Sequence, residues 1–370
     1  MAHRYNFVLP REMAEENSTA SHLAVAMTTQ KDDNTQTVGD ISWVVDGFYL
    51  QLVVVVIGVI GTAGNALILY ALVASKQHKK HVLIVNQNAL DLFSCIFLII
   101  SYAVKLPNIQ LAGALGYWLC IILISDMFVW YGLVGSVVNL AIITIYRYLK
   151  VVHHTSSKKW MRPWMINSAM AFAWFVSIAT NTPFVFETTG VIDGVCHSWV
   201  LYKSNVDRIA SLVWYIVSWY IIILVIFVYC YGRILATIRR QARVMASHVA
   251  AGSNSSQTQS HKIQTNVIKT MILVSAFYAI AWLPVNVYYA FVMTDPHLTY
   301  LNSYWYASIF CAFLYTSANP FIYAVKFDPV KQFLSSMVLC KKASVEPIDI
   351  PLAAVRSHTG ASERYLTREH

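Results

Sequence analysis

Seven long apolar runs constrain the fold of this 370-residue chain more than any other feature of its sequence. A helix needs about 20 mostly apolar residues to cross the hydrocarbon core of a bilayer, and each run is long enough. Charged residues make up only 12% of the chain, about half of what a soluble domain carries. We therefore predict an all-α membrane protein, a bundle of seven transmembrane helices. The predicted spans are residues 48–73, 82–104, 118–149, 164–186, 208–238, 265–293 and 303–325.

The segments between these runs alternate in charge, and this alternation predicts how the bundle is oriented. Basic residues gather in the first, third and fifth segments and after the last run, whereas the other segments are poor in them. Basic loops stay on the cytoplasmic side, so we expect the N-terminus outside and the C-terminus inside. The net charge of +9 then reflects topology, and we expect no nucleic-acid partner. The basic residues are Lys76, Lys79, Lys80, Lys150, Lys158, Lys159, Arg162, Arg239, Arg240, Arg243, Lys262, Lys326, Lys331, Lys341 and Lys342.

The polar ends divide the chain into three parts. We predict a disordered extracellular tail over residues 1–47, a seven-helix domain over 48–340 and a cytoplasmic tail over 341–370. Asn17 begins an Asn-Ser-Thr sequon in the first tail and is a candidate for N-glycosylation. Since no short apolar core with a cleavage site precedes the first run, we expect that run to act as an uncleaved signal anchor.

A short amphipathic helix is predicted directly after the seventh run. Asp328 is a suitable N-cap and Pro329 a suitable first helical residue, and apolar residues recur at helical spacing as far as Val338. Such a helix lies in the membrane interface. Cys340, at its end, is well placed for palmitoylation, and a free thiol near the surface is the alternative.

Polar residues in the middle of the runs predict what the bundle interior contains. Asp91, Ser136 and Asn319 would be costly to expose to lipid, so we expect them to face other helices. Pro284 and Pro320 remove backbone donors and should kink their helices. A seven-helix transporter or channel is an alternative, although neither paired charges along a pore nor repeated halves stand out. The histidines lie in loops and ends rather than at mid-membrane, so we do not expect an enzyme.

Each run also carries a short motif, and the motifs follow one another in a family order. They are Gly64-Asn65, Leu90-Asp91, Tyr146-Arg147-Tyr148, Trp174, Tyr231, Trp282-Leu283-Pro284 and Asn319-Pro320-Phe321-Ile322-Tyr323. In this order the chain resembles the rhodopsin-like (class A) G-protein-coupled receptors over residues 48–340. The resemblance implies a plasma-membrane receptor that binds an extracellular ligand within the bundle. It would activate heterotrimeric G proteins by outward movement of the sixth helix, with arrestin and receptor kinases as later partners.

The resemblance assigns roles to particular residues. Those that would couple to the G protein are Arg147, Tyr148 and Tyr231. Those that would form the activation switch are Trp282, Pro284, Asn319, Pro320 and Tyr323. The resemblance also implies a sodium ion held by Asp91, Ser136 and Asn319, with a hydrogen-bonded carboxyl group lacking sodium as the alternative. Arg147 could instead be an arginine that extends its charge to the membrane interface, Trp282 could serve only aromatic packing, and Asn319-Pro320 could be only a kink.

The family pattern further implies a disulfide bond between Cys120 and Cys196, on the oxidising side of the membrane. Cys120 lies two residues further from Arg147 than the family norm, and a bulge or a longer helix would absorb the difference. Tyr146 stands where the family usually has the acid that pairs with this arginine, and Gln264 where some members have a glutamate. We therefore expect a weakly restrained resting state with some basal activity.

Two further departures concern the activation switch. Tyr278 replaces the usual phenylalanine below Trp282, and the fifth run has Ile223 near the place of its usual proline. The coupling between a ligand pocket and the sixth helix is therefore expected to differ in detail from the family pattern.

The ligand is constrained mainly by what the pocket positions lack. Phe313 stands at the place of the retinal-binding lysine, and Val129 at that of the amine-binding aspartate, with Asp126 three residues earlier. A short stretch of the third run resembles melatonin-type and some peptide receptors, so a small molecule and a peptide both stay open. The candidate ligand-binding residues, for which helix packing is the alternative, are Asp126, Trp130, Asn286, Tyr289 and Trp305.

Overall fold

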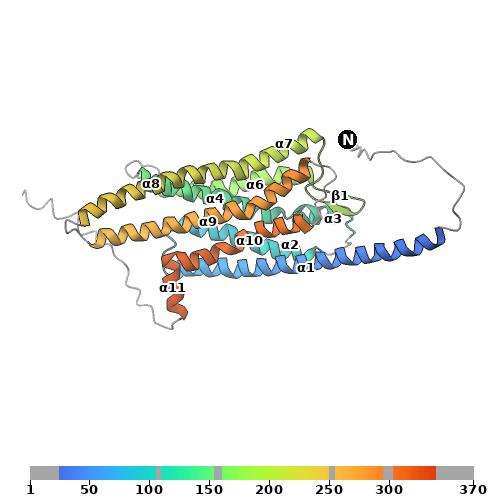
Figure 1. The fold of residues 1–370 in the computed structure, drawn as a ribbon, viewed down its shortest axis with the longest axis horizontal. Coiled ribbons are helices and arrows are strands. Elements are labelled where there is room, and N and C mark those ends of the chain that lie inside the picture. The colour runs from blue at the N-terminus through green and yellow to red at the C-terminus, as the bar shows by residue number, and fades with distance from the viewer. Residues whose placement is uncertain (1–24, 106–109, 154–160, 250–254, 295–302, 339–370) are drawn as a thin grey trace, which may run out of the picture.

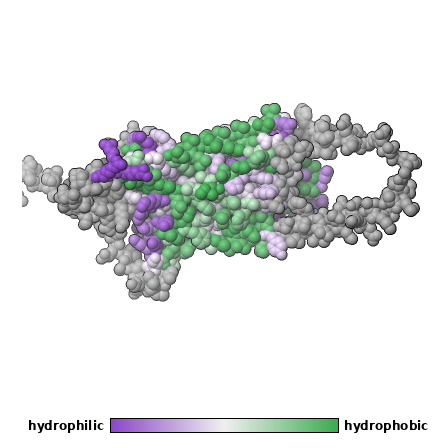
Figure 2. Space-filling model, viewed as in Figure 1, coloured by the Kyte–Doolittle hydropathy of each residue, from purple (hydrophilic) through white to green (hydrophobic). Residues whose placement is uncertain are grey.

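The computed structural model describes residues 25–105, 110–153, 161–249, 255–294 and 303–338, so Asn17 and Cys340 lie outside the described residues. Seven of its helices are long and apolar enough to cross a membrane, which confirms the predicted bundle. The spans run along the long axis in Figure 1, and apolar residues cover the middle of the visible face in Figure 2. The spans are Phe48–Ala74, Val82–Val104, Gly113–Val152, Pro163–Thr188, Asn205–Gln241, Thr265–Thr294 and Tyr304–Lys326.

The first span belongs to a helix that begins earlier than expected. Helix α1 (Val25–Ala74) includes residues 25–47, which were predicted as part of a disordered tail. This segment contains no proline, so no residue in it removes a helical backbone donor. The second span is α2 (Val82–Val104).

The third span contains the bulge that the position of Cys120 requires. It consists of α3 (Gly113–Leu119), the π-helix η1 (Cys120–Ile124) and α4 (Met127–Val152). Asp126, between η1 and α4, has a φ of 59°, in the left-handed region. A π-turn adds a residue to a helix without ending it, so the interruption lengthens the span between Cys120 and Arg147.

A β-hairpin follows the fourth span, α6 (Pro163–Thr188). Strands β1 (Gly190–Ile192) and β2 (Val195–His197) pair antiparallel, with Val191 opposite Cys196. Asp193 and Gly194 form the two-residue turn, and both have positive φ. Turns of this kind favour Asp-Gly, because glycine adopts positive φ without strain.

The remaining helices complete the bundle and its short final helix. The fifth span consists of α7 (Asn205–Ile216), the π-helix η2 (Val217–Ile221) and α8 (Ile222–Val249). The sixth and seventh spans lie in α9 (Ser255–Thr294) and α10 (Ser303–Lys326). Helix α11 (Asp328–Val338) turns away from the bundle axis in Figure 1. The predicted short helix after the seventh span is therefore present.

Helix α4 forms the centre of the bundle, and almost all of its residues from Val129 to Thr144 are buried. Gly132 lets it approach α2 closely. A Cβ atom on this glycine would lie 2.5 Å from Cβ of Ser94 and 2.9 Å from the carbonyl oxygen of Leu90. This close approach brings the polar residues of α2 and α4 together.

Candidate functional site

Asp91, Ser136 and Asn319 meet in the interior of the bundle, although they come from α2, α4 and α10. All three are fully buried. The Nδ2 of Asn319 donates a hydrogen bond of 2.8 Å to Oδ2 of Asp91, and Ser136 and Gln87 lie beside this carboxylate. The Oδ1 atoms of Asp91 and Asn319 are buried without a hydrogen-bond partner among the described residues. The cluster therefore combines a carboxylate with two buried oxygen atoms that accept no hydrogen bond from the described residues.

A chain of side-chain hydrogen bonds joins this cluster to α6. The indole Nε1 of Trp174 donates to Oδ1 of Asn86 over 3.1 Å, and Nδ2 of Asn86 donates to Oδ1 of Asn139 over 2.9 Å. The Nδ2 of Asn139 donates to Oε1 of Gln87 over 2.8 Å, and Nε2 of Gln87 donates to Oγ of Ser136. The sequence analysis missed Asn86 and Gln87. Two adjacent amides in an apolar run are costly in lipid, and that cost is the signal that would have found them.

Arg147 lies near the end of α4 that is opposite the hairpin. Its side chain is partly buried, and its Nε is fully buried without a hydrogen-bond partner among the described residues. Its guanidinium carbon is 5.6 Å from the ring centre of Tyr146. Lys105 and Asp126 form the one ion pair within the described part of the chain. Arg147 thus has no acidic partner in this part of the chain.

The two tyrosines grouped with Arg147 lie in different surroundings. The hydroxyl of Tyr231 is buried and hydrogen-bonded to Thr144 (2.9 Å) and Ser275 (3.0 Å), so it links α8 to α4 and α9. The hydroxyl of Tyr148 is exposed and lies 2.9 Å from Nε2 of His153. Tyr231 therefore links α4 to α8 and α9 from the bundle interior, whereas Tyr148 meets α8 near the surface, with its hydroxyl 3.5 Å from that of Tyr229.

His81 lies beside this region, in the segment before α2. Its ring meets the edge of Phe327 at a centroid distance of 5.0 Å. Burial of the imidazole, and then the positive charges of Arg147, Lys150 and Lys80, lower the pKa of His81 to about 4. The side chain is consequently neutral at physiological pH.

The switch residues of the sixth span form part of an aromatic column. Trp282 is buried between Trp130 on α4 (6.2 Å between ring centres) and Tyr278 one turn below it (5.8 Å). The hydroxyl of Tyr278 donates to the carbonyl oxygen of Trp219 in η2, and Tyr220 donates to the carbonyl oxygen of Ala279 over 2.9 Å. These reciprocal bonds join the π-helix η2 to α9 in a span that lacks its usual proline.

The remaining candidate switch residues include two prolines and a tyrosine. Pro284 is inside α9 and Pro320 inside α10. Tyr323 is fully buried, with its ring 6.2 Å from that of Phe327 at the start of α11. The Arg147 ends of α9 and α10 are themselves joined, because Thr270 donates to the carbonyl oxygen of Lys326 over 3.1 Å.

Asp126 differs most from its expected role as a ligand-binding residue. Its Oδ2 is 2.6 Å from Nζ of Lys105, and that ammonium also lies 3.9 Å from the ring centre of Tyr102. A ligand amine would therefore have to replace a cation that the chain itself supplies. This arrangement is in keeping with Val129 at the place of the amine-binding aspartate.

The other candidate ligand-binding residues lie in the hairpin half of the bundle. Trp130 packs between Trp282 and Trp199. Asn286 is buried and donates to the carbonyl oxygen of Trp282 over 2.7 Å. The hydroxyl of Tyr289 lies 3.2 Å from that of Tyr202, and Trp305 packs against Tyr288 at 5.7 Å. The structure brings Trp130 next to Trp282. Tyr289 on α9 instead contacts Tyr202, and Trp305 on α10 contacts Tyr288 on α9.

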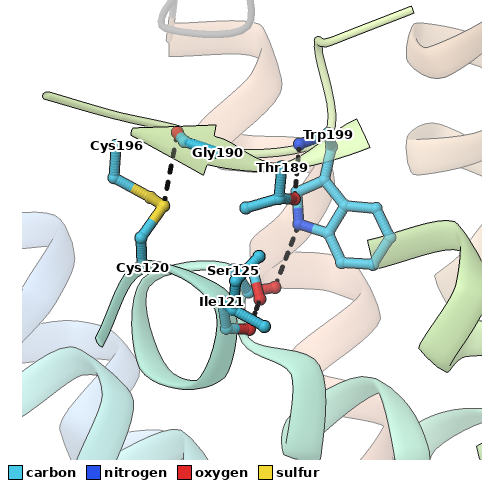
Figure 3. The surroundings of a disulfide bond; sticks show 7 residues. All are labelled: Cys120, Ile121, Ser125, Thr189, Gly190, Cys196 and Trp199. Carbon is cyan, nitrogen blue, oxygen red and sulfur yellow. Dashed lines mark hydrogen bonds between the residues drawn. A yellow bond between two sulfur atoms is a disulfide. The ribbon is translucent and has the colours of Figure 1, made fainter. Parts of the chain in front are cut away.

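A disulfide between Cys120 and Cys196 holds the hairpin against the third span, which confirms that prediction (Figure 3). The chain beyond the hairpin is held as well. The indole of Trp199 donates to the carbonyl oxygen of Ser125 over 3.0 Å, and its backbone N–H donates to Oγ1 of Thr189 over 3.3 Å. The hairpin and Trp199 together cover this end of the bundle.

Comparison with known proteins gives one consistent result. The sequence model of the 7 transmembrane receptor (rhodopsin family) matches residues 64–323. Galanin receptor type 1 of Rattus norvegicus is 23% identical over 315 residues, 82% of this chain and 86% of that receptor. The substance-K receptor of Homo sapiens is 26% identical over 287 residues, 74% of this chain and 67% of that receptor. The crystal structure of squid rhodopsin has the same fold, with a TM-score of 0.64 at 16% identity, covering 80% of this chain and 86% of that one.

Proposed function

Because the chain belongs to the rhodopsin family of seven-transmembrane receptors, we propose that it is a plasma-membrane receptor that binds a peptide ligand and activates a heterotrimeric G protein. The relatives support the ligand class, since the galanin and substance-K receptors are among them. The ligand would enter at the hairpin end, where Trp130 and Trp199 lie above Trp282. Receptor kinases and arrestin would act later, on the serines and threonines of the tail 343–367.

The orientation that this function needs is supported by two features. Disulfides form in oxidising compartments, so the end with Cys120 and Cys196 is assigned to the outside. Basic residues gather in the segments at the opposite end, which is the pattern of cytoplasmic loops. The N-terminus would then be extracellular and Arg147 cytoplasmic.

The partly buried Arg147, without an acidic partner among the described residues, is the observation that carries the proposal. Outward movement of the cytoplasmic end of α9 around Pro284 would uncover this guanidinium for carbonyl groups of the G protein. The movement would break the bonds of Thr270 to Lys326 and of Ser275 to Tyr231. A ligand would drive it by binding the open state better than the closed one.

Guanine-nucleotide exchange in membranes that contain this chain tests the proposal. The wild-type receptor should promote the exchange of GDP for GTP on added G protein. Arg147→Ala should reduce that exchange by at least about tenfold. Arg240→Ala, which removes an exposed arginine of α8, should keep most of it. Equal loss in both variants, or exchange no higher than in membranes without the receptor, would refute this role. Transport of a solute without exchange would favour the transporter.

We further propose that the Asp91 cluster binds a sodium ion. A carboxylate, a hydroxyl group and an amide oxygen are hard oxygen donors, which suit such a cation. The unpartnered Oδ1 atoms of Asp91 and Asn319 support this fit. A bound ion would join α2 and α10 electrostatically and stabilise the closed bundle. Sodium should therefore raise the unfolding temperature of the purified receptor, and Asp91→Asn should abolish that effect.

A further inference from the structure

The hydrogen-bond chain from Trp174 to the Asp91 cluster has a fixed direction. An indole N–H can only donate, so it must face the oxygen of Asn86. The amide nitrogen of Asn86 then faces Oδ1 of Asn139. Amide oxygens and nitrogens are otherwise hard to tell apart, and their orientation is assigned from their partners. Here the donor at the α6 end sets the orientation of the first two amides.

A second fixed group sets the same direction at the next step. The Nδ2 of Asn139 also donates to the backbone carbonyl oxygen of Leu83 over 3.0 Å, and a carbonyl can only accept. The nitrogen of Asn139 must therefore face both Leu83 and Gln87. The amide oxygen of Gln87 is consequently the acceptor, and its nitrogen must point to Ser136.

The consequence is that Gln87 brings N–H groups to the Asp91 cluster. One N–H occupies a lone pair on Oγ of Ser136, beside the Asp91 carboxylate. Asn319 donates to the carboxylate itself. Amide N–H groups therefore reach both Ser136 and Asp91.

We infer that Gln87 competes with sodium for the Asp91 cluster and sets the sodium concentration at which the ion binds. A cation needs oxygen lone pairs, and the N–H of Gln87 occupies one on Ser136. Binding of the ion must break or displace this bond, so this residue weakens sodium affinity. The inference rests on the proposed sodium site and adds the residue that tunes it.

The test measures the unfolding temperature of the purified full-length receptor as sodium chloride replaces choline chloride at constant ionic strength. Gln87→Met keeps a side chain of similar length without an N–H donor or an amide oxygen. It should lower the sodium concentration for half-maximal stabilisation by about tenfold, the equivalent of one or two hydrogen bonds. Gln87→Leu serves as a second variant if the first does not fold. Potassium chloride in place of sodium chloride should raise the unfolding temperature less, both in the wild type and in the Gln87 variants.

Asn88→Met is the matched control, because it removes the adjacent buried amide. Asn88 donates within its own helix, to the carbonyl oxygen of Ile84 over 2.8 Å, so its loss should leave the sodium midpoint unchanged. Equal midpoints in wild type and Gln87→Met would overturn the inference, while the sodium site would stand if Asp91→Asn still abolished the response. An absent sodium response in wild type and both Gln87 variants would overturn the inference together with the site. Guanine-nucleotide exchange is measured separately, so neither result decides G-protein coupling.

Discussion

The side chain before Arg147 is an aromatic ring rather than a carboxylate. Tyr146 lies beside the guanidinium at 5.6 Å, a distance at which a ring attracts a cation only modestly. A carboxylate would instead make charge-assisted hydrogen bonds, which are about twice as strong as neutral ones. Among the described residues no carboxylate restrains Arg147, and the contacts that join the helices at this end of the bundle include that of Thr270 with the carbonyl oxygen of Lys326.

Tyr146→Asp should lower basal nucleotide exchange at least about fivefold, because the new carboxylate can pair with Arg147 in the closed state. Exchange without ligand, measured against membranes lacking the receptor, checks this expectation. Tyr146→Phe keeps the ring and should retain wild-type basal exchange. If the aspartate variant is as active as wild type without ligand, the missing acid is not what weakens the resting state.

His81 gives the folded receptor a pH dependence that can be measured. In the unfolded chain an ordinary histidine takes up a proton near pH 6.5, whereas burial and nearby cations lower the pKa of folded His81 to about 4. Between these values the unfolded state binds more protons, so stability falls as the pH decreases.

His81→Phe should make the unfolding temperature fall less between pH 7 and pH 5 than it does in wild type. Thermal unfolding of the purified receptor across that range is the measurement. Lys79→Gln changes an exposed residue of the same segment and should keep the wild-type slope. Parallel curves for His81→Phe and wild type would show that this imidazole does not contribute.

At the scale of whole helices, the two π-turns lie in the two spans that depart from the family pattern. The turn η1 (Cys120–Ile124) and the left-handed Asp126 after it lie between Cys120 and Arg147 and lengthen that stretch. The turn η2 includes Trp219, whose carbonyl oxygen accepts from Tyr278. Such turns add a residue and leave carbonyl groups available to other partners. The turn η1 therefore includes the disulfide-bonded Cys120, and η2 includes the residue that accepts a hydrogen bond from α9.

The packing of α4 on α2 depends on the absence of a side chain at Gly132. Gly132→Ala should destabilise the receptor by about 1–3 kcal/mol, because the new methyl group would overlap Ser94 and the carbonyl oxygen of Leu90. Unfolding temperature with and without sodium measures this effect. Gly232→Ala is the control, since a Cβ atom there meets nothing within 4 Å. Similar losses in both variants would mean that helix contact is not the cause.

At the scale of the molecule, the sequence predicted the features that depend on composition along the chain. Seven spans follow from the length of the apolar runs, and the helix after the seventh span follows from its periodicity and from Pro329. The disulfide followed from the family pattern. Asp91, Ser136 and Asn319 were recognised because polar groups at mid-membrane require partners.

Other features could not be predicted, because they depend on geometry that hydropathy does not encode. The positions of η1 and η2 depend on a single extra residue, which leaves the apolar pattern unchanged. The helical start of α1 at Val25 lies in polar sequence. The role of Gln87 depends on the direction of three amides, and that direction is fixed by Trp174 and Leu83 on different helices.

The bond between Cys120 and Cys196 also turns part of the chain into a closed ring, with a sequence separation of 76. Helices α4 and α6 both lie within that ring, so they stay covalently tethered when the fold is lost. In the chain-entropy view, such a ring stabilises the folded state by about 4 kcal/mol through fewer unfolded conformations. A single protease cut between α4 and α6 would open the ring without releasing either fragment. The two pieces should migrate together on a gel until a reducing agent separates them.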